Sequence, residues 1–361
     1  MLRLFSRTLP TTAKSISSAP LRTNQLISRT SYQIVRNMGN GKASNEDLKG
    51  SKLFDVSHVT ALVTGGGTGI GLMITQALVA NGAKVYITSR REEVLKKTEE
   101  LYNSGPGQVI PLVADVSEKD DVKRLYDEMC QKEPKGIQIL VNNAGIARDE
   151  NTKFSTNGQP NMEDPQAISD HFLKSEPMQW ADTMKTNVGS IYWMSMTFLP
   201  LLAKGGNVTP GYSSQVINVS SISGYMKGSS NGQFAYASSK AAATHLSRML
   251  ATTFTGTKVR VNTIAPGVFP SEVRTPTFDS SSSYLVKKYG ADIHKMTTGN
   301  SDEDNKSRIE SGMSNPAGRP GADTDMAATV LMLAGPGGVF YNEQVLYPDG
   351  GSTLSQPAAR A

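Results

Sequence analysis

The sequence has little of what disulfides and metal sites require. Among 361 residues it contains one cysteine, Cys130, which by itself can form neither an intrachain disulfide nor a thiolate metal site. The four histidines are scattered without the spacing of metal ligands, so we predict no metal site. No apolar run approaches the about 20 residues of a membrane-spanning helix, and we therefore predict no membrane insertion.

Acidic residues are missing from the first 45 positions, which carry seven Lys and Arg among many Ser and Thr. This composition is typical of a mitochondrial transit peptide, so we predict that residues 1–45 direct the protein to the mitochondrial matrix. A disordered basic tail is the alternative, and translation from Met38 would give a cytoplasmic form. The remaining chain has 30 basic and 32 acidic residues, which offers no electrostatic argument for binding nucleic acid or a membrane surface.

After residue 58, segments typical of buried strands alternate with segments typical of helices. A polar stretch at about 148–176 has no predicted element, and long helices follow near 178–205 and from residue 234. Strands that alternate with helices predict a parallel sheet covered on both faces, so we expect residues 46–361 to form a single α/β domain. The seven predicted strands span residues 59–64, 84–89, 108–116, 137–145, 215–221, 258–267 and 343–351.

The turn after the first strand is rich in glycine, with the sequence TGGGTGIG from Thr64 to Gly71. Glycines at this point of a βαβ unit let the backbone approach a phosphate, which the helix N-terminus then binds. The end of the second strand distinguishes the cofactor, since NAD sites tend to place an acid there and NADP sites an arginine. Ser89 stands in the place of the acid and is followed by Arg90 and Arg91, so we predict NADP(H). The alternative is that both arginines only solvate the start of the next helix.

Tyr236 and Lys240 are four residues apart on a predicted helix, so their side chains emerge on one face. A phenol has a pKa of about 10 in water, and an ammonium one turn away favours the phenolate and brings proton transfer closer to neutral pH. A hydroxyl from the preceding strand end could hold a substrate oxygen against the tyrosine. The same spacing recurs at Tyr284 and Lys288, in a polar segment that we expect to be solvated surface.

Together these motifs resemble the short-chain dehydrogenase/reductase family, over about residues 55–352. The family's elements occur in its order: TGGGTGIG, ADV at 114–116, NNAG at 142–145, the asparagine of KTNVG, VSS, YASSK and APG at 265–267. The resemblance implies a Rossmann-type, doubly wound, seven-stranded parallel sheet. The sequences PGVFPSE and NNAGIARDE look most like the branch of 3-oxoacyl-carrier-protein reductases and their relatives.

The resemblance implies a role for each matching position. Tyr236 would be the general acid/base, Lys240 would assist it and hold the nicotinamide ribose, and Asn187 would complete a proton relay. Ser221 would hold the substrate oxygen. Contacts with the cofactor are implied for Tyr236 and Lys240 and for Thr64, Gly65, Gly69, Ile70, Gly71, Arg90, Arg91, Asp115, Val116, Asn142, Ala144, Gly145, Pro266 and Gly267.

The identity of the catalytic serine has two candidates. Ser221 has Gly224 three residues after it, as the family does, but it lies fifteen residues before Tyr236, slightly farther than usual. Ser223 lies at the usual distance. Extra residues fit more easily in the loop KGSSNGQ than inside the strand end, so strand register favours Ser221.

The implied activity is NADP(H)-dependent reduction of a carbonyl to an alcohol, or the reverse. With a mitochondrial presequence, a 3-oxoacyl thioester is the expected substrate; a polyol or ketose reductase, or a general carbonyl reductase, is the alternative. A non-enzymatic, NADPH-bound structural subunit is a third reading. By the resemblance, residues at about 268–318 would form a substrate lid, and helices near 178–203 and 234–255 would pair in a homotetramer or dimer.

Overall fold

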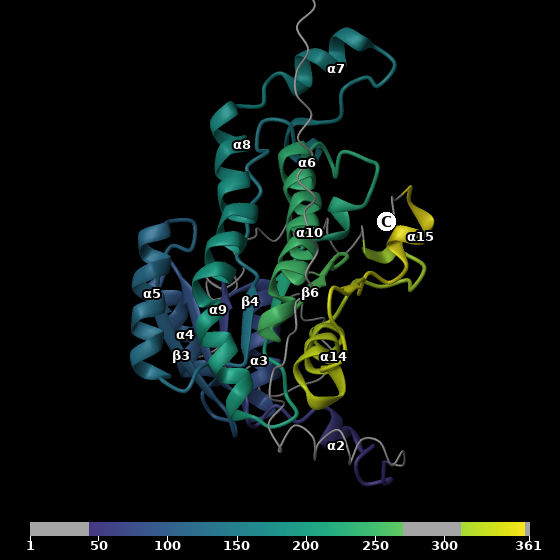
Figure 1. Cartoon of the computed structure of the whole chain (residues 1–361). Helices are drawn as coiled ribbons and strands as arrows, with labels where there is room; N and C mark the ends of the chain where they lie inside the picture. Colours follow the sequence, from purple (N-terminus) through teal and green to yellow (C-terminus); the bar gives the residue numbers. More distant parts are fainter. Residues whose placement is uncertain (1–42, 270–311, 358–361) are drawn as a thin grey trace, which may run out of the picture. The chain divides into compact units, whose positions relative to one another are not determined.

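The computed structural model describes residues 43–269 and 312–357 (Figure 1). The predicted transit peptide therefore lies almost wholly outside the described residues. Most of the predicted lid and the pair Tyr284–Lys288 also lie outside them.

In the described residues seven parallel strands form one sheet, as predicted, and their order is β3-β2-β1-β4-β5-β6-β7. The strand order reverses between β1 and β4, which is the point at which open α/β sheets bind their ligands. The central strands are buried along almost their whole length because helices cover both faces. The strands are β1 (Thr60–Thr64), β2 (Lys84–Ser89), β3 (Gln108–Val113), β4 (Ile139–Asn142), β5 (Gln215–Val219), β6 (Arg260–Ile264) and β7 (Val345–Leu346).

Two hydrophobic clusters lie on opposite faces of this sheet. On one face pack α3 (Gly69–Ala80), α14 (Asp323–Ala334) and Leu95 of α4 (Glu92–Tyr102). On the other pack α5 (Lys119–Lys132), α9 (Ser190–Val208) and α10 (Phe234–Phe254). The arrangement confirms the predicted doubly wound, single-domain architecture. Short helices α2 (Gly50–Leu53) and α15 (Ser352–Ser355) lie near the ends of the described chain.

The helix predicted near 178–205 is interrupted. The chain forms α8 (Pro177–Met184), then a π-helical turn at Lys185–Gly189, and then α9. A π turn inserts one residue into the helical ladder and is frequent at functional sites. This turn carries Asn187, which is buried. No helix of the described residues is at once long and apolar enough to span a bilayer.

The polar stretch at 148–176 is more ordered than expected. It contains α6 (Phe154–Asn157) and α7 (Pro165–Phe172), which begins with an Asp164 cap whose carboxylate accepts a hydrogen bond from the Gln166 N–H at 2.9 Å. The Phe172 ring packs edge-on against Phe234, the first residue of α10, with ring centroids 5.0 Å apart. The segment therefore packs against the start of α10, a contact between distant residues that local sequence patterns do not reveal.

Candidate active site

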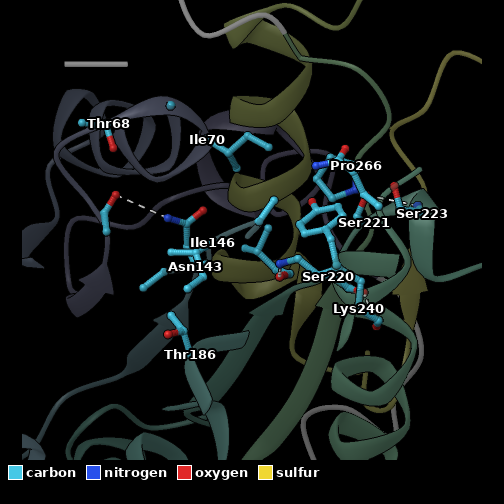
Figure 2. Close-up of a pocket in the computed structure, with 18 of the residues that line it drawn as sticks. Thr68, Ile70, Asn143, Ile146, Thr186, Ser220, Ser221, Ser223, Lys240 and Pro266 are labelled. Carbon is cyan, nitrogen blue, oxygen red and sulfur yellow. Dashed lines mark hydrogen bonds between the residues drawn. The ribbon is translucent and has the colours of Figure 1, made fainter. Parts of the chain in front are cut away.

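A cavity of about 1080 Å³ opens at the carboxyl ends of the strands (Figure 2). The loops that follow β1 to β6 all contribute to its wall, together with the first turns of α3 and α10. Figure 2 shows Ser221, Ser223 and Pro266 grouped on one side of the cavity, with Thr68 across the view from them. The cavity thus brings together the glycine turn and the Tyr236 helix, which are far apart in the sequence.

The turn after β1 is shaped to hold a phosphate. Gly65 has a φ of +65°, and a Cβ there would lie 3.0 Å from Nδ2 of Asn143 and 3.3 Å from Cα of Ala144. The hydroxyl of Thr64 anchors the neighbouring loop, because it accepts hydrogen bonds from the N–H groups of Asn143 (2.9 Å) and Ala144 (3.0 Å). Only glycine fits this left-handed, crowded position, and its bare backbone faces the cavity.

The first turn of α3 adds donors to this cradle. Thr68 at the N-cap makes no side-chain hydrogen bond to the helix, so the first N–H groups are available to an anion. Thr88, on β2, also lines the cavity, and its buried hydroxyl has no partner among the described residues. Buried hydroxyls are normally hydrogen-bonded, so an orphan in the cavity wall fits a ligand that supplies the partner. The residues present therefore fit a dinucleotide.

Two arginines follow β2 at the rim. The guanidinium of Arg90 is 65% exposed and lies 3.8 Å from a carboxylate oxygen of Asp115. The other oxygen of Asp115 accepts hydrogen bonds from the N–H and the hydroxyl of Ser117 at 3.0 and 2.7 Å. Ser89, Arg90, Arg91 and Asp115 all line the cavity. A positive side chain therefore stands at the place where the sequence predicts one.

Tyr236 and Lys240 enter the cavity from the start of α10. The ammonium of Lys240 lies 5.7 Å from the centre of the Tyr236 ring and donates a hydrogen bond to the Val219 carbonyl at 3.0 Å. Lys240 is only 5% exposed, and the hydroxyl of Ser220 donates to its carbonyl at 2.8 Å. The end of β5 thus holds both the backbone and the side chain of Lys240 in place beside the tyrosine.

Both candidate serines line the cavity, in different settings. Ser221 lies two residues after the end of β5. Its hydroxyl oxygen accepts a hydrogen bond from the Ser223 N–H at 3.1 Å. The Ser223 hydroxyl lies 2.7 Å from the hydroxyl of Ser230, in the loop before α10. Ser223 therefore has a hydroxyl partner in the protein, whereas the Ser221 hydroxyl proton has no acceptor among the described residues.

The side chain of Asn187 connects two elements beside the cavity. Its amide oxygen accepts from the Ile146 N–H at 2.8 Å, and its amide nitrogen donates to the Ile146 carbonyl (2.8 Å) and to the Ser239 hydroxyl (2.9 Å). The side chain thereby ties the loop after β4 to α10. A Cβ on Gly145 would lie 3.2 Å from the Asn187 amide oxygen and 3.4 Å from the Lys240 nitrogen. Asn187 itself does not line the cavity, and its relay role stays a prediction.

Three predicted cofactor residues, Thr64, Gly71 and Asn142, also lie outside the cavity wall, while the other predicted residues line it. Gly71 is behind the glycine turn, where a Cβ would lie 2.1 Å from the Gly65 carbonyl oxygen. Asn142 is 3% exposed, and its amide donates to Ser195 and Asn218 inside the domain. Neighbouring residues of an extended chain point in opposite directions, so Asn143 is the one that lines the cavity. The side chain of Asn142 thus forms a bond between β4 and β5, and direct contact of this residue with the cofactor stays a prediction.

Asp149, which no motif predicts as a site residue, lines the cavity and is 3% exposed. Its carboxylate oxygens accept hydrogen bonds from the N–H groups of Ala235 (2.9 Å) and Tyr236 (3.1 Å). Burial raises the pKa of Asp149 above its ordinary value, and these two N–H donors oppose that rise. Neither the partners nor the burial could be inferred from the local sequence, because the partners lie 86 and 87 residues away.

The known proteins that are similar to this chain all point to one family. A family model for the short chain dehydrogenase matches residues 59–281. The chain is 37% identical to the short-chain dehydrogenase/reductase PhomF′ of Diaporthe leptostromiformis, over 86% of this chain and 97% of that protein. It is 32% identical to the rhamnolipids biosynthesis 3-oxoacyl-[acyl-carrier-protein] reductase of Pseudomonas aeruginosa, over 83% of this chain and 98% of that one.

Among solved structures, the Pseudomonas aeruginosa RhlG/NADP active-site complex superposes with a TM-score of 0.62. It shares 31% sequence identity and covers 83% of this chain and 98% of its own. The family model covers more than half of the chain, and the glycine turn, the Tyr236 helix and the parallel sheet agree with it. The chain belongs to the short-chain dehydrogenase/reductase family of oxidoreductases, which bind NAD(P).

Proposed function

We propose that this oxidoreductase uses NADP(H) to reduce a carbonyl to an alcohol, or to run the reverse reaction, with Tyr236 as the proton donor. The observation that carries the proposal is that Tyr236, Lys240 and Ser221 line the same cavity as the glycine turn after β1. A proton donor beside a dinucleotide cradle is what the addition of a hydride and a proton to a carbonyl requires.

The residues that follow β2, at the rim of the cavity, favour NADP(H) over NAD(H). Arg90 and Arg91 line the cavity where an acid would otherwise bind the ribose hydroxyls of NAD. Arg90 is 65% exposed and its ion pair with Asp115 is long, at 3.8 Å, so its guanidinium can turn toward a ribose phosphate. The solved relative from Pseudomonas aeruginosa is a complex with NADP, which supports the same choice here.

In the proposed mechanism the glycine turn and the start of α3 would hold NADPH, which would supply a hydride for the carbonyl carbon. The hydroxyl of Ser221 donates a hydrogen bond to the substrate oxygen, and the phenol of Tyr236 transfers its proton to that oxygen. Lys240 is held beside the ring by the Val219 carbonyl, so its positive charge stabilises the phenolate that remains. Lys240 and Ser221 are held by hydrogen bonds at the end of β5 before the substrate arrives, which lowers the cost of reorganisation.

A 3-oxoacyl thioester is the first candidate substrate. The Pseudomonas aeruginosa relative named as a 3-oxoacyl-[acyl-carrier-protein] reductase aligns along almost its whole length, which supports this chemistry. The apolar side chains of Ile146, Val268 and Phe269 line the cavity and could contact an acyl chain.

A ketose or polyol is the second candidate, and the polar part of the cavity wall favours it. Many side chains there can donate or accept hydrogen bonds, as the hydroxyls of a sugar would require. They are Glu150, Lys153, Ser155, Thr156, Ser230, Asn231 and Gln233. A general carbonyl reductase would have the same catalytic groups.

The test is cofactor oxidation by the full-length protein with NADPH and NADH separately, on a short-chain 3-oxoacyl thioester, a ketose and an aromatic diketone. We expect NADPH-linked turnover, fastest with the thioester. Tyr236→Phe should lower turnover by at least about 100-fold and leave NADPH binding largely intact. Tyr341→Phe, at a 40% exposed tyrosine outside the cavity wall, is the control and should behave as the wild type. An active Tyr236→Phe variant would contradict the proposed mechanism. Tight NADPH binding without turnover of any substrate would favour a structural subunit.

Localisation and assembly are separate proposals. Import into the mitochondrial matrix rests on the composition of residues 1–45, and a fluorescent fusion to those residues tests it. A homotetramer or dimer rests on the exposed apolar side chains of α9 and α10, such as Tyr192 and Met249 at 39% and 55% exposure. Sedimentation of the wild type and of Met249→Glu would show whether this face is an interface.

A further inference from the structure

The catalytic helix begins without a cap of its own. The first N–H groups of any α-helix have no partner inside the helix and need one from outside. Gln233, at the N-cap of α10, makes no side-chain hydrogen bond to that first turn. Tyr236 lies on this turn, so the position of its phenol depends on what holds the turn.

Asp149 supplies the missing cap from a distant part of the chain. One carboxylate oxygen accepts from the Ala235 N–H at 2.9 Å and the other from the Tyr236 N–H at 3.1 Å. Because both oxygens are used, the carboxylate constrains the turn against rotation as well as translation. A carboxylate at a helix N-terminus also interacts favourably with the helix dipole.

The loop that carries Asp149 is itself attached to the residues before α10. The Phe154 N–H donates to the Asn231 carbonyl at 3.0 Å. The Lys153 N–H bonds the Asp149 carbonyl at 3.0 Å and closes the loop. Asp149 is therefore fixed relative to the cofactor side of the cavity, since this loop continues directly from the Asn143–Gly145 wall.

The burial of this carboxylate costs stability. Desolvation raises the pKa of Asp149, so the charged form is disfavoured at a place where a neutral polar residue could still accept one hydrogen bond. This carboxylate stands in the wall of the active-site cavity and binds the Tyr236 N–H, which indicates a role in placing that residue.

We propose that Asp149 is a positioning residue for Tyr236: it holds the first turn of α10 so that the phenol meets the substrate oxygen. The inference rests on the proposed role of Tyr236 as proton donor. Displacing a reacting group by about 1 Å can cost about 100-fold in rate, so the loss of this cap has a kinetic signature that a general loss of stability lacks.

The test compares Asp149→Ala, Asp149→Asn and Thr152→Val in the full-length protein. We expect Asp149→Ala to lower kcat by about 10- to 100-fold, with KM for the carbonyl and Kd for NADPH changed less than about threefold. Asp149→Asn keeps an oxygen for one N–H and should recover part of kcat, with a thermal midpoint near that of the wild type. Thr152→Val is the matched control, because it breaks a hydrogen bond between the same two loops without touching α10. It should lower the thermal midpoint and leave kcat within about twofold.

Amide hydrogen exchange at residues 234–237 of the same variants tests the capping by Asp149 separately from the proposed enzymatic function. Faster exchange in Asp149→Ala and not in Thr152→Val supports the cap even if the wild type turns over none of the substrates, in which case the proposed function alone fails. Unchanged exchange in Asp149→Ala overturns the inference. An unchanged kcat in that variant, or equal losses of kcat in Asp149→Ala and Thr152→Val, also overturns it.

Discussion

Gly71→Ala tests whether close packing of α3 against the glycine turn shapes the cofactor site. A Cβ at this position would lie 2.1 Å from the Gly65 carbonyl oxygen and 2.4 Å from the Asn143 amide nitrogen. Carbon and oxygen atoms that are not bonded to each other approach to about 3.3 Å, so the helix start and the turn must separate by about 1 Å. The Asn143 side chain can rotate, but the Gly65 carbonyl belongs to the turn itself.

Gly71→Ala should lower both the folding stability and the affinity for NADPH. Overpacking of this kind costs about 1–3 kcal/mol of folding stability. The N–H groups of α3 and the backbone of Gly65 would also lose their common alignment on the pyrophosphate. We expect Kd for NADPH to rise at least tenfold, which corresponds to about 1.4 kcal/mol. Urea unfolding measures the first effect, and calorimetric titration with NADPH measures the second.

Gly256→Ala is the control for this substitution. A Cβ there meets nothing within 4 Å, and its φ is not in the left-handed region. Its stability should change by less than about 1 kcal/mol, and its affinity for NADPH should equal that of the wild type. If Gly71→Ala binds NADPH as tightly as the wild type, the close approach of helix and turn does not position the phosphate-binding groups, and the reasoning fails.

Three further predictions address the cofactor, the serine and alkaline stability. Arg90→Ala should raise KM for NADPH by about tenfold or more and leave KM for NADH nearly unchanged; an equal change for both would exclude a role in binding the phosphate. Ser221→Ala should lower kcat by about 100-fold, whereas Ser223→Ala should lower it much less, and the reverse order would move the catalytic role to Ser223. Tyr212 donates a hydrogen bond to the Ala334 carbonyl at 2.8 Å, and burial raises its pKa to about 12. From about pH 10 to 12 the folded phenol keeps a proton that the unfolded chain releases, so folding stability falls as the pH rises. Tyr212→Phe should remove about 2–3 kcal/mol of that fall, measured by urea unfolding against pH, and an unchanged slope would contradict the assignment.

Much of the fold followed from local sequence patterns. Most strands are short segments with a majority of apolar residues, and the glycine turn and the start of α10 carry motifs whose residues suit phosphate binding and proton transfer. The seven strands and their parallel arrangement could be predicted because buried strands alternate with helices. The π turn at Asn187 and the helices α6 and α7 could not be predicted from the sequence. Although α7 has a local cap at Asp164, it packs through aromatic contacts with residues far away in the sequence.

Local sequence is enough to assign the chemical groups of the site: a glycine turn, arginines after the second strand, and Tyr236 with Lys240 on one helix face. Those assignments depend on spacing within a few residues, where helix and strand periods are reliable. Which groups share a cavity, and what each of them contacts, became known from the folded arrangement of the chain. It placed Gly71 behind the turn, turned Asn142 into the domain, and brought Asp149 to the Tyr236 N–H across 87 residues of chain. Such hydrogen bonds and close contacts form between residues remote in sequence, so no local pattern records them.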